Sequence, residues 1–156
     1  MQNQSFNTTI FVDQSAEEVY RAINNVRGWW SANAEGSSNL LNDVFKVDFG
    51  SHWWALKIVE TVPGKKVVWL VTDSKLNFIK NKQEWTNTKI IFEISTENGE
   101  TKIYFTHKGL VPPVECFDAC SNAWTQYIHQ SLAALVTSGK GSPTPKEIET
   151  TLRGNK

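Results

Sequence analysis

The sequence predicts an α+β fold in which a curved antiparallel sheet of about six strands wraps on a long C-terminal helix, with a short helix after the first strand. Three observations predict it: an early helical pattern, a middle stretch of period-two segments, and a long apolar helical pattern near the end. Short turns at Pro63-Gly64 and at residues 97–99 join the middle segments. Because parallel strands need long crossover connections, these turns predict antiparallel pairing.

The first strand and the first helix are predicted by local signals. Residues 5–12 are rich in Thr, Ile, Phe and Val, which is typical of a strand. Ser15 followed by Glu18 three residues later is a capping box, and it predicts a helix over residues 16–25. Residues 31–41 are small and polar, and they predict a loop with room for one helical turn.

The middle of the chain predicts the sheet. Alternating or β-branched runs predict strands at residues 43–49, 52–62, 66–72, 88–96 and 101–107. Between the third and fourth of these runs, residues 73–87 show no clear period. We expect a strand end and a mobile loop there.

The C-terminal helix is predicted over residues 114–137. Apolar residues recur every three or four positions along it, at Phe117, Cys120, Trp124, Ile128, Leu132 and Leu135. Gly139 is expected to end the helix. We therefore expect one domain over residues 1–140 and a polar tail over 141–156, with a short helix over 145–152.

Composition excludes several classes of function. Sixteen basic and sixteen acidic residues give zero net charge, which argues against a nucleic-acid binder and against a polybasic membrane-surface protein. No apolar run is long enough to span a membrane and no secretory signal is seen, so we expect a cytoplasmic protein. No Gly-rich phosphate-binding loop occurs, so we expect no ATPase activity.

The two cysteines, Cys116 and Cys120, lie four apart in the predicted helix. Their side chains would then point the same way along one helix face, so we expect free, buried thiols rather than a disulfide. His107 could join them around a metal ion, but a structural zinc site usually needs four ligands. We therefore expect no metal and no other cofactor.

Several segments together resemble the START-like (SRPBCC) superfamily, and within it the bacterial proteins similar to the C-terminal domain of the activator of heat-shock protein 90 ATPase. The segments that carry the resemblance are Val12 to Tyr20, Trp29-Trp30, Val67-Val68-Trp69, Phe105 to Pro112, and Trp124, Tyr127, Ser131 and Leu132. The resemblance covers roughly residues 5–140. It implies a helix-grip fold, with the closing helix held against the curved sheet.

Aromatic side chains are the candidate ligand-binding residues. An unusual aromatic content of 12%, with seven tryptophans, suits either a packed sheet core or a cavity walled by rings. The resemblance favours a cavity between the sheet and the closing helix. The residues expected to line it are Trp54, Trp69, Phe105, His107, Cys120, Trp124, Tyr127 and Ile128. None of them is assigned as catalytic.

Three functions follow as hypotheses. The first is binding of a small hydrophobic or amphipathic molecule in that cavity. The second is contact with a chaperone, as a stand-alone relative of the co-chaperone domain. The third is a cyclase- or hydrolase-like enzyme that uses His107 as a base, although His107 could equally be a structural residue satisfied at its strand end. We expect no nucleic-acid or membrane partner, and either a monomer or a homodimer.

Overall fold

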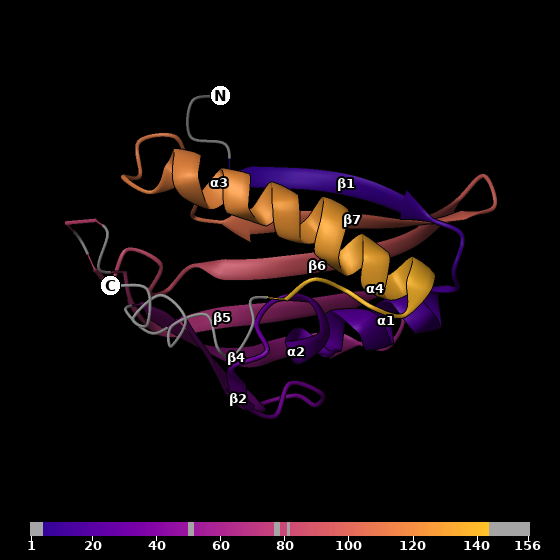
Figure 1. The fold of residues 1–156 in the computed structure, drawn as a ribbon, viewed down its shortest axis with the longest axis horizontal. Coiled ribbons are helices and arrows are strands. Elements are labelled where there is room, and N and C mark those ends of the chain that lie inside the picture. The colour runs from indigo at the N-terminus through magenta and orange to yellow at the C-terminus, as the bar shows by residue number, and fades with distance from the viewer. Residues whose placement is uncertain (1–4, 50–51, 77–78, 81, 144–156) are drawn as a thin grey trace, which may run out of the picture.

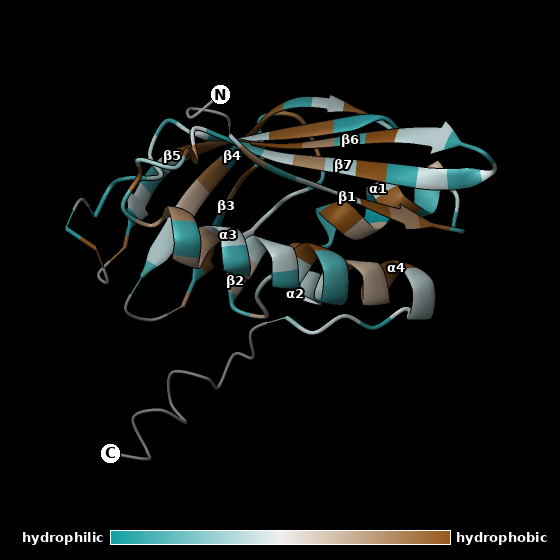
Figure 2. Ribbon diagram, turned by 90° about the horizontal axis from the view of Figure 1, so that it is seen from above, coloured by the Kyte–Doolittle hydropathy of each residue, from teal (hydrophilic) through white to brown (hydrophobic). Residues whose placement is uncertain are grey.

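The computed structural model describes residues 5–49, 52–76, 79–80 and 82–143, and it has the predicted α+β architecture. Seven antiparallel strands form one sheet in the order β1-β7-β6-β5-β4-β3-β2. The strands are β1 (Phe6–Val12), β2 (Ala34–Gly36), β3 (Val44–Asp48), β4 (Trp53–Val62), β5 (Lys66–Lys75), β6 (Lys89–Glu97) and β7 (Glu100–Lys108). All helices lie on one face of this sheet (Figures 1 and 2).

Helices are present where two were predicted, at residues 16–25 and 114–137, and a further short helix that was not predicted covers Val26–Trp29. The helical segments are α1 (Ala16–Asn24), α2 (Val26–Trp29), α3 (Phe117–Gln126), the π-helical segment η1 (Tyr127–Leu132) and α4 (Ala133–Ser138). The capping box is present, because the Ser15 hydroxyl accepts from the Glu18 N–H while the Glu18 carboxylate accepts from the Ser15 N–H. Gly139 ends α4 in the left-handed conformation, with φ of 85°.

The last three helical segments form one continuous rod across the sheet (Figure 1). The rod begins at Phe117, three residues later than predicted, because the preceding residues form turns in which Val114 N–H donates to Val111 O and Phe117 N–H to Val114 O. The predicted apolar stripe faces the sheet: its buried members are Cys120, Trp124, Ile128 and Leu132.

Two parts of the sheet differ from the prediction. β2 forms where a loop was expected, by pairing Ala34–Gly36 with residues 45–47 of β3; three residues are too few to show a period in the sequence. β5 runs to Lys75 rather than ending near Thr72, because residues 73–75 continue to pair with β4 beyond a bulge. Residues 73–75 are polar, so the sequence shows no apolar alternation there that would predict a strand.

The prediction of free thiols is wrong, because the structure joins Cys116 and Cys120 in a disulfide. Cys116 directly precedes α3, with φ of −88° and ψ of 8°, so it is not part of the regular helix on which the prediction relied. Its Cα lies 5.6 Å from that of Cys120, within the usual range for a disulfide. The expected cytoplasmic location, which rested partly on free thiols, stays a prediction.

The chain after the helical rod turns back onto it. Ser142 N–H donates to the Ser131 hydroxyl, 2.8 Å away. The short helix predicted over 145–152 lies outside the described residues. Within the described part of the chain, no helix is long and apolar enough to cross a membrane.

Candidate functional site

A partly enclosed cavity of about 120 Å³ lies between α3 and the sheet, where β3 ends and β4 begins. We call it the aromatic pocket. It is lined by Trp30, Phe49, His52, Trp54, Trp85, Ala119, Cys120, Ala123, Trp124 and Tyr127. Almost all of this lining is apolar, so the pocket suits an apolar group.

Half of the residues predicted for the site line the pocket. Trp54, Cys120, Trp124 and Tyr127 do so, whereas Trp69, Phe105, His107 and Ile128 are fully buried in the core and do not. Rings fill most of the space between sheet and helix. The parallel contact of Trp30 and Trp69, with ring centroids 5.9 Å apart, is one example.

Sequence reasoning missed several lining residues. Ala119 and Ala123 lie eight and four positions before the predicted Tyr127 on the same helix face, so this spacing could have identified them. The small alanines leave the room that a larger side chain would fill. Trp85 comes from a segment of turns between β5 and β6, and no periodic signal could have placed it.

Four tryptophans line the aromatic pocket, and Trp85 contacts two of the others. The ring of Trp85 lies nearly parallel to that of Trp124, with centroids 5.8 Å apart. Its centroid is 4.8 Å from that of Trp54. Trp85 therefore links the sheet wall to the helix wall, and a shift of this one side chain would reshape the pocket.

Trp54 carries a polar group without a partner. Its side chain is buried, and among the described residues its indole N–H meets no hydrogen-bond acceptor. A buried donor without an acceptor costs free energy. This N–H is closed to solvent, so an oxygen acceptor on a bound molecule would recover that cost only if the Trp54 ring turns toward the pocket.

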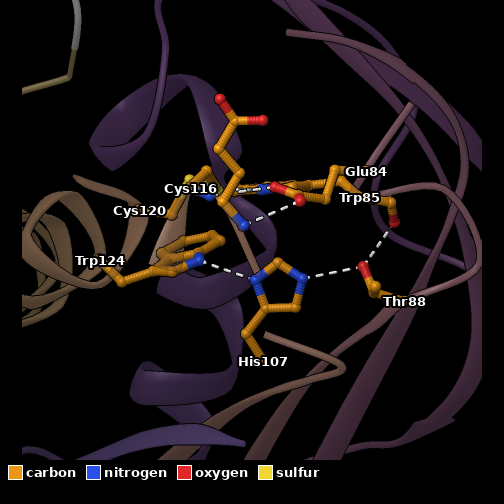
Figure 3. The surroundings of a disulfide bond; sticks show 8 residues. Glu84, Trp85, Thr88, His107, Cys116, Cys120 and Trp124 are labelled. Carbon is orange, nitrogen blue, oxygen red and sulfur yellow. Dashed lines mark hydrogen bonds between the residues drawn. A yellow bond between two sulfur atoms is a disulfide. The ribbon is translucent and has the colours of Figure 1, made fainter. Parts of the chain in front are cut away.

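His107 is buried against the rings of Trp85 and Trp124 and takes part in a row of hydrogen bonds (Figure 3). The Trp124 indole N–H, which can only donate, lies 3.0 Å from His107 Nδ1, so Nδ1 is the unprotonated nitrogen. Nε2 then carries the proton and donates to the Thr88 hydroxyl 2.8 Å away, which in turn donates to the Trp85 carbonyl. Burial lowers the pKa of His107 to about 3, so the ring is neutral at pH 7.

His52 lines the pocket with an imidazole ring. Burial lowers its pKa, and the nearby charge of Asp48 opposes that shift. The imidazole is therefore mostly neutral at pH 7. Its ring lies edge-on to Trp54, with centroids 5.4 Å apart, and it extends the aromatic wall.

The disulfide lies at the edge of the pocket. The Trp85 indole N–H donates to Cys116 Sγ at 3.2 Å, and Cys120 belongs to the pocket wall. The Glu84 carboxylate accepts from the N–H groups of Glu115 and Cys116, at 2.9 and 3.1 Å. The segment that carries Trp85 is thus tied to the start of α3.

Within the described residues, no group of three or more His, Cys, Asp or Glu side chains could hold a metal ion.

Comparison with known proteins identifies relatives of this chain. The family model described as "Activator of Hsp90 ATPase homolog 1-like protein" matches residues 13–137. No curated protein matches the chain.

Two solved structures illustrate the shared fold. The Aha1 dimer from Colwellia psychrerythraea, solved in solution, has a TM-score of 0.71 and 24% identity, over 90% of this chain and 100% of that one. The crystal structure of SSP2350 from Staphylococcus saprophyticus has a TM-score of 0.67 and 12% identity, over 91% and 98%.

Proposed function

The chain belongs to the activator of Hsp90 ATPase homolog 1-like family, and we propose that it binds a small, largely apolar molecule in the aromatic pocket. The observation that carries the proposal is the pocket wall itself. Tryptophan rings from β4, from the turn at Trp85 and from α3 face one cavity, while Ala119 and Ala123 leave it unfilled. Apolar concave sites with few polar groups are the usual form of a small-molecule site.

The size of the pocket limits the ligand. A volume of about 120 Å³ is below the roughly 300–1,000 Å³ of pockets that hold drug-sized molecules. It is close to that of an apolar cavity of about 150 Å³ that binds benzene in another protein. The enclosed part of the ligand is therefore a single ring or a short branched chain, and an oxygen acceptor on it would pair with the Trp54 N–H once that ring turns toward the pocket.

A matched pair of small molecules tests the proposal. Acetophenone and α-methylstyrene have nearly the same shape, but only the ketone has an oxygen acceptor. We expect both to shift the indole N–H signals of Trp54, Trp85 and Trp124 in nitrogen-15 NMR titrations and to leave that of Trp29 in place. The ketone should bind about three- to tenfold more tightly, as one added hydrogen bond predicts.

Two neighbouring helix positions provide the control. Ala123→Leu fills the pocket and should abolish both titrations, whereas Asn122→Leu adds the same side chain at a position outside the lining and should leave them unchanged. If neither compound shifts the three indole signals at millimolar concentration, the proposed function is wrong.

The enzyme alternative gains no support from this geometry. His107 is fully buried and does not line the pocket, and both of its ring nitrogens are engaged. A general base must be within reach of the proton that it removes. The contacts of His107 favour a structural role, in which it orients Trp124 and the turn from Trp85 to Thr88.

Contact with a chaperone is a second candidate, supported by an exposed apolar patch. Leu40, Leu41 and Val44 are 69%, 52% and 56% exposed, and the turn that presents them is fixed by the Asp43 carboxylate, which accepts from the Leu40 N–H. Grouped exposed apolar side chains are typical of contact surfaces.

Titration with purified Hsp90 tests this candidate. The double variant Leu40→Ser, Leu41→Ser should bind Hsp90 more weakly than wild type, and equal affinities of the two proteins would reject the candidate.

A further inference from the structure

We propose that the Cys116–Cys120 disulfide is a redox modification site that controls the aromatic pocket: the oxidised form holds Trp85 in the wall and binds ligand, and the reduced form releases it. The proposal rests on the proposed function, since it assigns a regulation to the same site. It starts from the placement of the two sulfur atoms. Cys120 is part of the pocket lining, and Cys116 Sγ accepts the hydrogen bond of the Trp85 indole.

A small set of contacts surrounds the disulfide (Figure 3). Besides the bond from Trp85, Glu84 accepts from two backbone N–H groups just before α3, and the Lys80 N–H donates to the Glu115 carboxylate at 3.0 Å. All of these contacts join the segment between β5 and β6 to residues 115–116. While the disulfide is intact, Cys116 cannot rotate, so Trp85 has an acceptor in a fixed position.

The effect of the bond is expected to be local. Only four positions separate the two cysteines, and closing so short a loop removes little conformational freedom from the unfolded chain. Its breakage should therefore leave the sheet and the helical rod intact. What changes is the side chain of Cys116, and with it the hydrogen bond that orients Trp85.

The chemistry of reduction fits the site. The thiolate of a dithiol reductant attacks Cys120 Sγ from the pocket; a mixed disulfide forms, the bond between the two cysteine sulfurs breaks, and Cys116 leaves as a thiolate. The Trp85 N–H already points at that leaving sulfur. The second thiol of the reductant then attacks the mixed disulfide and releases Cys120, so the dithiol becomes a cyclic disulfide and both cysteines take up protons.

Ligand binding and reduction must then be coupled in both directions. If reduction weakens binding by a given factor, a bound ligand stabilises the oxidised form by the same factor. A ligand in the pocket also covers Cys120, which is only 5% exposed and is reached through the pocket. Occupied protein should be reduced more slowly than empty protein.

The experiment compares the full chain in its oxidised form with the same protein reduced by dithiothreitol. We expect the Trp85 indole N–H signal to shift on reduction and its exchange with deuterium to accelerate at least tenfold, while the Trp29 and Trp69 signals stay in place. We expect acetophenone to bind the reduced form about three- to tenfold more weakly, and saturating acetophenone to slow reduction.

Two variants test whether the disulfide acts on ligand binding through the Trp85 hydrogen bond. Cys116→Ser removes the disulfide without changing the pocket lining and should behave like reduced protein when no reductant is present. Trp85→Phe keeps a ring in the wall but removes the N–H donor, so its oxidised and reduced forms should bind acetophenone with nearly equal affinity.

The outcomes separate this proposal from the proposed function. An unchanged Trp85 signal together with equal affinities would overturn the redox site and leave ligand binding standing. A Trp85 signal that moves when acetophenone binds neither form would support the redox site and overturn the proposed function. Two free thiols in aerobically purified protein, or loss of all indole signals on reduction, would also overturn the redox proposal.

Discussion

At the scale of single residues, His107 shows how burial decides the role of a titratable side chain. Its place on the inward face of β7 was predicted from the alternation with Phe105 and Ile103, and both of those neighbours are buried with it. The sequence left open whether it would act as a base. Its two hydrogen bonds and its lowered pKa favour a neutral ring that joins helix to sheet.

This environment predicts how stability depends on pH. The unfolded chain binds a proton at His107 below pH 6.5, whereas the folded protein keeps this ring neutral down to a pKa of about 3. Stability is therefore fully present above pH 6.5 and falls as the pH is lowered, by at most about 1.4 kcal/mol per pH unit. Between pH 7 and pH 5, urea denaturation should show a loss of about 2 kcal/mol from this residue.

A single histidine variant isolates the contribution of His107. His107→Gln should flatten the pH dependence, whatever its absolute stability. His52, whose pKa is also lowered, adds a contribution of the same sign. If His107→Gln and wild type have equal slopes, the neutral buried ring is wrong.

At the scale of elements, the π-helical segment η1 connects the helical rod to the rest of the domain. The buried hydroxyl of Ser131 donates to the Trp29 carbonyl at 2.6 Å and accepts from the Ser142 N–H. One side chain thus fixes α2 and the returning chain against the rod. Gly141 lies in the same contact, where an added Cβ would come within 2.4 Å of the Gly28 carbonyl oxygen.

We predict that Ser131→Ala destabilises the protein by about 1–3 kcal/mol, because it removes the hydroxyl that donates to the Trp29 carbonyl and accepts from the Ser142 N–H. Ser138→Ala, at an exposed position of the same rod, should change the free energy of unfolding by less than about 0.5 kcal/mol. Denaturant titration of both variants measures the difference. Equal effects at the two positions would mean that Ser131 does not join these elements.

At the scale of the whole molecule, periodic sequence patterns predicted the strands and helices that follow a regular spacing, and they missed the features that have none. Long alternating or helical runs predicted the antiparallel sheet, the early helix and the helical rod, and the structure confirms them. The three-residue strand β2, Trp85 and the disulfide depend on contacts between segments without a period. The aromatic pocket was therefore half predicted: its helix and β4 walls followed from spacing, but Trp85 did not.

The central claim is that the aromatic pocket admits a single apolar ring. Crystals of the oxidised protein equilibrated with bromobenzene test it most directly, because anomalous scattering locates the bromine without reference to any model of the ligand. We predict one bromine peak in the pocket, between the rings of Trp54, Trp85 and Trp124. A pocket that is open to solvent in the crystal but carries no bromine peak would contradict the claim.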